Sequence, residues 1–164
     1  MANTFTQIYL QFVFAVQDRM SRIRPEWKND LYRYITGIIQ NNNHKLIAIN
    51  GIPNHIHIFV DYKPHQRIPD LMQDVKGNSS KWINEKGYLP GKFQWQEGYG
   101  AFSYSYSQID SVIKYIMNQE KHHKRKTFRE EYIELLEQFR IKYDQRYILR
   151  DVGNEYIVPD GTII

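Results

Sequence analysis

Two histidines near the middle of the chain have the spacing of metal ligands on a strand. His55 and His57 are separated by one residue, Ile56. Because side chains of a strand alternate between its two faces, both imidazoles are expected on the same face. Two such imidazoles can bind one divalent ion, since imidazole is a ligand for several transition metals. The site would need a third ligand from elsewhere, and the alternative is a pair of buried histidines with satisfied hydrogen bonds.

A second group of reactive residues lies in a helical pattern that begins near residue 109. Tyr115 and Gln119 are four positions apart and therefore share a helix face. His122 continues that face seven positions after Tyr115, and His123 lies four positions after Gln119. Tyrosine offers a phenol nucleophile, and glutamine offers a neutral oxygen ligand. The alternative for Tyr115 is ordinary amphipathic packing.

Strand and helix patterns around these residues indicate how they would be positioned. We predict strands over residues 6–16, 45–50, 55–61, 93–96 and 100–106, and helices over residues 25–41, 68–86, 108–121 and 128–142. The turn before His55 predicts a hairpin between the second and third strands. Small polar residues at 76–80 are expected to interrupt the second helix. Ser107 is expected to cap the third helix, with Asp110 at the capping-box position.

The order of the first six elements matches the split βαβ pattern of a ferredoxin-like sheet. The predicted fold class is therefore α+β, an RRM-like antiparallel sheet with helices on one face and additional C-terminal helices. Such a sheet exposes its other face. If the first helix covers the aliphatic face of residues 55–61, His55 and His57 lie on the opposite face.

Length and composition indicate a single domain with an ordinary core. The 164 residues, 41% of them hydrophobic, predict one domain over residues 1–150 with a C-terminal tail over residues 151–164. The chain has no cysteine, which excludes disulfides and thiolate metal sites. It contains no apolar run that could span a membrane and no signal-peptide pattern at its N-terminus, so we expect a cytoplasmic protein without membrane contact.

The net charge of +4 is concentrated near the end of the tyrosine helix. Six consecutive residues form a basic run that could contact DNA phosphates or be a solvated helix end: Lys121, His122, His123, Lys124, Arg125 and Lys126. Aromatic residues make up 15% of the chain. Trp95, Tyr99 and Tyr104 could stack on bases of a single strand or pack in the core.

The two motifs together resemble those of a known family. His55-Ile56-His57, followed by a helix with Tyr115-Ile-Met-Asn-Gln119, is similar to the HUH-superfamily single-tyrosine transposases of the bacterial insertion-sequence two-hundred type. Relatives of these enzymes include the REP-associated tyrosine transposases. The segment 76–80 also resembles the family's helix after the HUH strand, and the resemblance covers roughly residues 5–129. A histidine-triad hydrolase would need a third histidine where Phe59 stands.

The resemblance implies a DNA transposase that cleaves and rejoins single-stranded DNA. His55, His57 and Gln119 would hold Mg²⁺ or Mn²⁺, and Tyr115 would attack a phosphodiester and form a 5′-phosphotyrosine intermediate. It also implies DNA with hairpin ends and a homodimer whose subunits share active sites. How Tyr115 is activated stays open, with proximity to the metal, Lys114 and His122 as candidates. The roles of His122 and His123 also stay open, since either could assist the metal or contact a phosphate.

Two other functions remain compatible with the sequence. One is a non-catalytic module that binds single-stranded nucleic acid on the same fold. The other is a metal-dependent phosphoesterase that uses water as its nucleophile.

Overall fold

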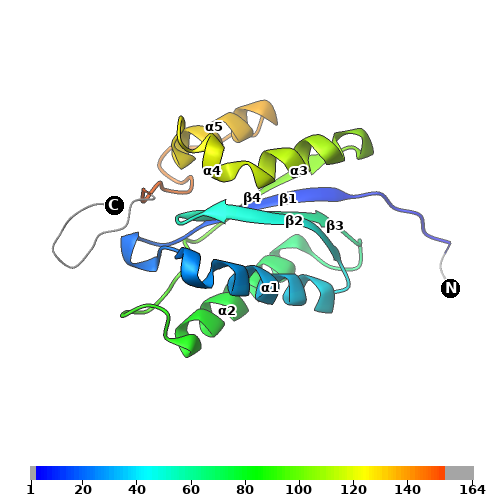
Figure 1. The fold of residues 1–164 in the computed structure, drawn as a ribbon. Coiled ribbons are helices and arrows are strands. Elements are labelled where there is room, and N and C mark those ends of the chain that lie inside the picture. The colour runs from blue at the N-terminus through cyan, green and yellow to red at the C-terminus, as the bar shows by residue number, and fades with distance from the viewer. Residues whose placement is uncertain (1–2, 154–164) are drawn as a thin grey trace.

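The computed structural model describes residues 3–153. They form three layers, a central sheet with helices on each of its two faces (Figure 1). The strands are β1 (Tyr9–Ala15), β2 (Lys45–Ile52), β3 (His55–Asp61) and β4 (Gly100–Tyr104). The helices are α1 (Pro25–Asn41), α2 (Ile68–Lys86), α3 (Ile109–Met117), α4 (Gln119–His122) and α5 (Phe128–Gln138), with short 3₁₀ turns at Arg19–Ser21 and Tyr106–Gln108. Within residues 3–153, no helix is long and apolar enough to cross a membrane.

The sheet has the order β2-β3-β1-β4, and each neighbouring pair is antiparallel. This order is that of a ferredoxin-like sheet and confirms the predicted fold class. The β2–β3 hairpin closes tightly at Gly51, where an added Cβ would collide with the backbone oxygen of His55. The register places His57 opposite Val13 and His55 opposite Ala15 of β1. The histidine strand therefore lies in the middle of the sheet.

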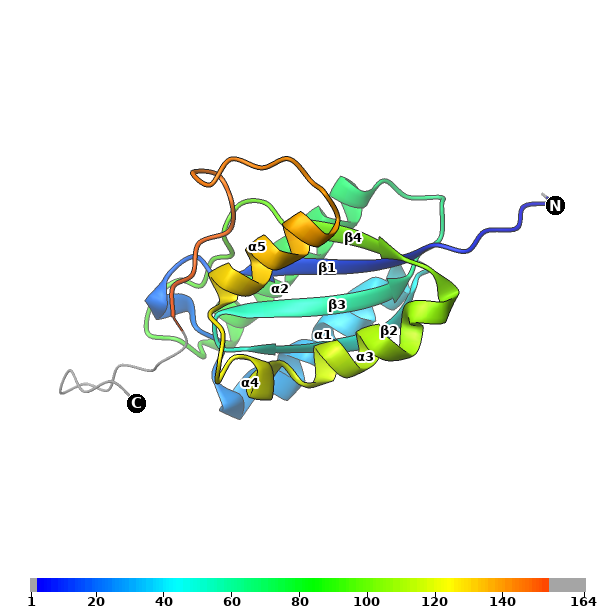
Figure 2. The same ribbon diagram turned by 90° about the horizontal axis from the view of Figure 1, so that it is seen from above.

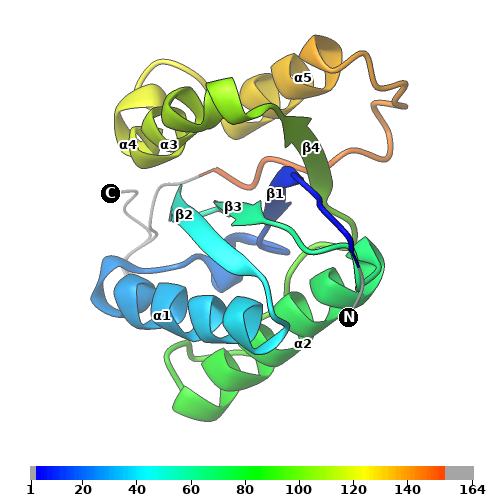
Figure 3. The same ribbon diagram turned by 90° about the vertical axis from the view of Figure 1, so that its right-hand side faces the viewer.

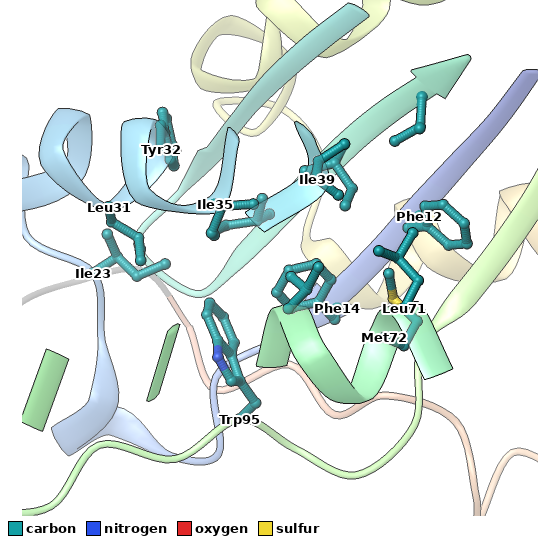
Figure 4. Packing of buried hydrophobic residues seen from close by; sticks show 14 of the residues in the cluster. Phe12, Phe14, Ile23, Leu31, Tyr32, Ile35, Ile39, Leu71, Met72 and Trp95 are labelled. Atoms are coloured by element: carbon teal, nitrogen blue, oxygen red, sulfur yellow. The ribbon is translucent and has the colours of Figure 1, made fainter. Parts of the chain in front are cut away.

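One face of the sheet carries the main core, beneath α1 and α2 (Figure 4). Pro25 begins α1, a position where its missing N–H costs nothing. Trp27, Leu31, Ile35 and Ile39 then recur at helical spacing and are all buried. They pack with strand residues Phe12, Phe14, Ile56, Ile58 and Val60, and with Leu71, Met72 and Val75 of α2. The aliphatic face of β3 is thus directed away from the histidines, as expected.

The opposite face is also covered, so the prediction of an exposed sheet face was wrong (Figure 3). The reason is that the central strands carry buried apolar residues on both faces. Val13 and Ala15 of β1 pack with α5. Phe59 of β3 packs with α3. Figure 2 shows α3 and α4 on the β2 side and α5 on the β1 side, with β3 running between them.

Two predicted interruptions of regular structure differ from what the structure shows. Helix α2 continues through residues 76–80, because Ser79 is buried and its Oγ accepts a hydrogen bond from Trp95 Nε1 at 2.9 Å. Residues 93–96 do not form a strand. Their one strand-type pairing is an isolated bridge between Trp95 and Val16, and Phe93 and Trp95 serve as core side chains instead.

Three helix ends also differ from the predictions. Ser105 and Gln108 form the capping box, two residues before the predicted pair of Ser107 and Asp110. The tyrosine helix ends at Met117 and a short helix follows it. Helix α5 ends at Gln138. The predicted tail begins within the described residues, but its part after residue 153 lies outside them.

Candidate metal and nucleophile site

The two histidines of β3 are fully buried and held in one tautomer each. His55 Nδ1 lies 2.6 Å from Asn54 Oδ1, and His57 Nδ1 lies 2.6 Å from Gln11 Oε1. An amide oxygen can only accept, so each Nδ1 carries the proton and each Nε2 keeps a free lone pair. Burial also lowers the pKa of His55 to about 4, which keeps this imidazole neutral near pH 7. Both Nε2 atoms are therefore available as ligands.

A break between α3 and α4 directs the second pair of predicted residues toward these histidines. Val112 and Ile116 anchor α3 on Ala48 and Phe59 of the sheet. Asn50 of β2 then donates hydrogen bonds to the carbonyls of Ile116 (3.0 Å) and Met117 (3.3 Å), where α3 ends.

The sheet thus fixes the position at which α4 starts, and the new helix begins with a buried Gln119. Gln119 Oε1 lies 3.0 Å from His55 Nε2. The Tyr115 ring meets the His57 ring edge-on, with 5.7 Å between centroids. The structure brings Tyr115, Gln119, His55 and His57 together within one chain.

Helix α5 adds a buried carboxylate, Glu131, at the centre of this group. Thr127 caps the helix by accepting a hydrogen bond from Glu130 N at 3.1 Å. Phe128 and Leu135, three residues before and four after Glu131, pack into the core under α5. Because Glu131 shares their face, its side chain is carried inward and is only 1% exposed.

Glu131 uses its two oxygens differently. Oε1 lies 3.2 Å from both His55 Nε2 and His57 Nε2, and 3.0 Å from His123 Nε2. Oε2 accepts hydrogen bonds from the Tyr115 hydroxyl and from Gln119 Nε2. One carboxylate oxygen thus faces the three histidines, and the other is occupied by two donors.

The charges in this cluster are strongly coupled. Burial alone would raise the pKa of the Glu131 carboxyl, but His57, His123 and His55 outweigh it and hold that pKa well below its ordinary range. Burial, followed by the nearby Glu131 carboxylate, raises the pKa of Tyr115 above its ordinary value. The ground state therefore pairs an ionised carboxylate with a protonated phenol.

The donor set fits a divalent cation. His123 Nδ1 lies 2.7 Å from the carbonyl oxygen of Lys126, so its Nε2 also keeps a free lone pair. Three imidazole nitrogens, the amide oxygen of Gln119 and one oxygen of Glu131 then converge on one point. Both oxygens only accept hydrogen bonds, so a divalent cation at this point would take the place of imidazole protons and be bound by these atoms. Among the described residues, His55, His57 and Glu131 form the one group of three His, Asp or Glu ligand atoms that could hold a metal ion.

Glu131 and Gln11 are site residues that were not expected from the sequence. The signal for Glu131 was a carboxylate on the apolar face of α5, at helical spacing from Phe128 and Leu135. The signal for Gln11 was a polar side chain within the strongly apolar strand β1. A charged or amide side chain at a buried position needs partners, and both find them at the histidines.

The basic run is divided by the fold. His123 turns inward, with a side chain that is 2% exposed. His122 is partly buried beside Tyr115, with ring centroids 5.4 Å apart. Lys126 pairs with Glu134 at 2.5 Å. Lys121, Lys124 and Arg125 are exposed, and the last two line a hollow of about 320 Å³ next to the site. Lys114, one of the two residues considered as a general base for Tyr115, is exposed on α3.

Of the three aromatics considered for base stacking, Trp95 belongs to the core. Its ring packs edge-on against Phe14 and Phe93, at centroid distances of 4.7 and 4.8 Å. Tyr104 is half-buried, and its hydroxyl accepts a hydrogen bond from Gln11 Nε2 at 2.7 Å. Tyr99 is half-buried against the same core as Trp95.

Comparison with known proteins shows which family this chain resembles. The model of the family described as "Transposase IS200 like" matches residues 4–119. The chain is 25% identical over 118 residues to the ISDra2 transposase TnpA of Deinococcus radiodurans, covering 69% of this chain and 84% of that protein.

Two solved structures share the fold. One is a transposase from Deinococcus radiodurans, with a TM-score of 0.58 at 21% identity, covering 73% of this chain and 95% of the other. The second is a REP-associated tyrosine transposase bound to a REP hairpin, with a TM-score of 0.56 at 12% identity, covering 75% of this chain and 73% of the other.

Proposed function

Because this chain belongs to the family of IS200-like transposases, we propose that it cleaves and rejoins single-stranded DNA through a covalent tyrosine intermediate. The observation that carries the proposal is the convergence of Tyr115 and Gln119 on His55 and His57, from elements far apart in the sequence. A module that merely bound nucleic acid would not need a buried ligand set beside a tyrosine hydroxyl. The family and this geometry point to the same chemistry.

His55, His57 and Gln119 would hold the divalent ion, Mg²⁺ or Mn²⁺. When bound, the ion supplies positive charge to a non-bridging oxygen of the scissile phosphate. Asn54 and Gln11 keep the two imidazoles in the tautomer that coordinates, through their hydrogen bonds to Nδ1. These residues support the metal site without contacting the DNA.

Tyr115 is the proposed nucleophile. Its hydroxyl oxygen forms a bond to phosphorus while the bond from phosphorus to the 3′-oxygen breaks. The phenol proton is donated to Glu131 in the structure, so this carboxylate is placed to accept it, and the leaving 3′-oxygen takes up a proton to become a hydroxyl. The 5′-phosphotyrosine linkage conserves the energy of the broken phosphodiester bond. Attack by another 3′-hydroxyl therefore reverses the step and joins new ends.

Hairpin-ended single strands are the proposed substrate. The REP-associated relative was solved with a REP hairpin, which supports a structured single strand as the ligand of this chain as well. Exposed Lys121, Lys124 and Arg125 next to the site would contact its phosphates. A homodimer with shared sites remains a prediction from the family resemblance.

The direct test is to capture the covalent intermediate. Single-stranded DNA from the flanks of the gene, labelled at either the 5′ or the 3′ end, is incubated with protein and Mn²⁺ and separated on a denaturing gel. We expect the protein band to carry the 3′ label alone. Tyr115→Phe and EDTA should each remove this band.

Two outcomes would contradict the proposal. Cleavage that persists in Tyr115→Phe without an adduct would indicate water as the nucleophile. Tight DNA binding without cleavage of any flank sequence would indicate a binding module. A circular dichroism melt of Tyr115→Phe, expected to match the wild type within a few degrees, shows whether loss of adduct reflects chemistry or folding.

A further inference from the structure

We propose that Glu131 and His123 are themselves ligands of the divalent ion, which gives the site five protein ligands. The inference rests on the proposed function for the presence of an ion, and it extends the ligand set beyond the two histidines and the glutamine. It assigns α5 and the residues after α4 to the metal centre.

The distances between the five candidate atoms carry the inference. His55 Nε2 lies 3.1 Å from His57 Nε2, and 3.0 Å from Gln119 Oε1. His123 Nε2 lies 3.0 Å from Gln119 Oε1 and 3.0 Å from Glu131 Oε1. Glu131 Oε1 completes the set at 3.2 Å from both strand histidines.

These separations are those of neighbouring ligands in a metal coordination sphere. Metal–ligand bonds of roughly 2.0–2.2 Å at right angles place adjacent ligand atoms about 3 Å apart. Six of the ten pairs among these five atoms have this spacing. His55, His57 and Glu131 form the compact part of the set, with ligand atoms all within 4.8 Å of one another, and His123 joins it at the edge through Gln119 and Glu131. The Nδ1 atom of each of the three imidazoles already faces an acceptor, which directs Nε2 to the centre, and the other two atoms are oxygens of Gln119 and Glu131 that only accept hydrogen bonds.

The surrounding contacts orient each additional ligand. Glu131 Oε2 accepts from Tyr115 and Gln119, which leaves Oε1 directed at the histidines. His123 is fixed through Nδ1 by the Lys126 carbonyl, the same arrangement that Asn54 and Gln11 provide for the other two imidazoles. Partners of this kind on the second ring nitrogen are typical of metal-binding histidines. With five protein ligands, a six-coordinate ion would have one position left for a phosphate oxygen.

The test measures metal binding rather than activity. Mn²⁺ is titrated into the full chain and the free ion is followed by its electron paramagnetic resonance signal. Because loss of an outer partner alone costs about 10–100-fold in affinity, loss of a ligand should cost at least about 100-fold. We expect this for Glu131→Gln, which keeps the side-chain shape, and for His123→Ala.

Glu137→Gln is the matched control on the same helix. Glu137 is exposed and accepts a hydrogen bond from the Tyr143 hydroxyl, away from the histidines and from Lys126. This variant should bind Mn²⁺ with the wild-type affinity. A melt of each variant without metal shows whether it is folded. If Glu131→Gln fails to fold, His123→Ala alone decides the question.

Wild-type affinity for Mn²⁺ in folded Glu131→Gln and folded His123→Ala would overturn the five-ligand site. That result would leave the covalent chemistry of Tyr115 intact, since the adduct assay is separate. Conversely, a wild-type chain that forms no DNA adduct would refute the proposed function, while weakened Mn²⁺ binding in the two variants would still support the ligand set.

Discussion

At the scale of single residues, the site depends on which atom of each side chain is left free. His55, His57 and His123 each have Nδ1 beside a hydrogen-bond acceptor, which exposes Nε2 to the centre. Glu131 directs one oxygen to the same point and engages Tyr115 with the other. The proposed ligands and the proposed nucleophile, Tyr115, are therefore connected through one carboxylate.

A substitution at Gln11 tests whether the tautomer of a histidine controls metal binding, because His57 is the one candidate ligand among the described residues that shares a hydrogen bond with Gln11. We expect Gln11→Leu to weaken Mn²⁺ binding by about 10–100-fold, since His57 loses the acceptor that sets its tautomer. The control is Tyr104→Phe, which removes the other hydrogen-bond partner of Gln11 and should leave affinity near the wild-type value. Equal effects of the two variants would contradict the tautomer argument. Isothermal titration of Mn²⁺ measures both.

At the scale of elements, three separate packing arrangements converge on β3. Helix α3 is placed by apolar contacts with β2 and β3, and its end is fixed by Asn50. Helix α5 is placed by contacts with β1, β4 and the segment around Leu149. The alignment of Glu131 with the histidines consequently depends on how closely α5 approaches β4.

A substitution at Gly100 of β4 tests whether α5 must lie this close to β4. An added Cβ would come within 2.9 Å of Tyr132 and Phe102, so Gly100→Ala should push α5 outward and destabilise the fold by about 1–3 kcal/mol. We also expect weaker Mn²⁺ binding, because Glu131 adjoins Tyr132.

The control is Gly37→Ala within α1, where nothing lies within 4 Å of the added Cβ. This change should be neutral or stabilising by up to about 1 kcal/mol. Urea unfolding of both variants measures the difference. A Gly100→Ala protein as stable as the control would show that α5 is not held at this distance.

At the scale of the whole molecule, the site is assembled within one chain. The proposed nucleophile and the five proposed ligands come from β3, α3, α4, α5 and the turn between the last two helices. The family resemblance implied a homodimer in which one subunit's tyrosine helix completes the other's site. In the structure of the single chain, Tyr115 lies beside His57 of that same chain, with 5.7 Å between ring centroids.

Mixing two inactive variants distinguishes these arrangements. Tyr115→Phe lacks the nucleophile, and His57→Asn lacks a ligand. If each site is built from one chain, the mixture should form no DNA adduct above the sum of the separate proteins. Adduct formation in the mixture, with the label on the His57→Asn chain, would show that the tyrosine acts on the other subunit's metal site. Wild-type protein diluted to the same concentration controls for loss of activity.

Much of the architecture followed from the sequence because it depends on local pattern. The four strands from β1 to β4, helix α1 and the hairpin with His55 and His57 were predicted from periodicity and turn residues. Short-range spacing also fixed which side chains share a face. This is why His55 and His57, and separately Tyr115 and Gln119, could each be paired before any fold was known.

Only the tertiary structure decided which of these pairs meet and what joins them. The second covered face of the sheet, the break before Gln119 and the inward turn of Glu131 and His123 depend on contacts between residues far apart in the chain. Because these side chains are buried, their charges lose the stabilisation of water and must be balanced by one another. Their ionisation is therefore coupled. The sequence determined the chemical groups and their local spacing, and the packing of three helices on one sheet determined the site.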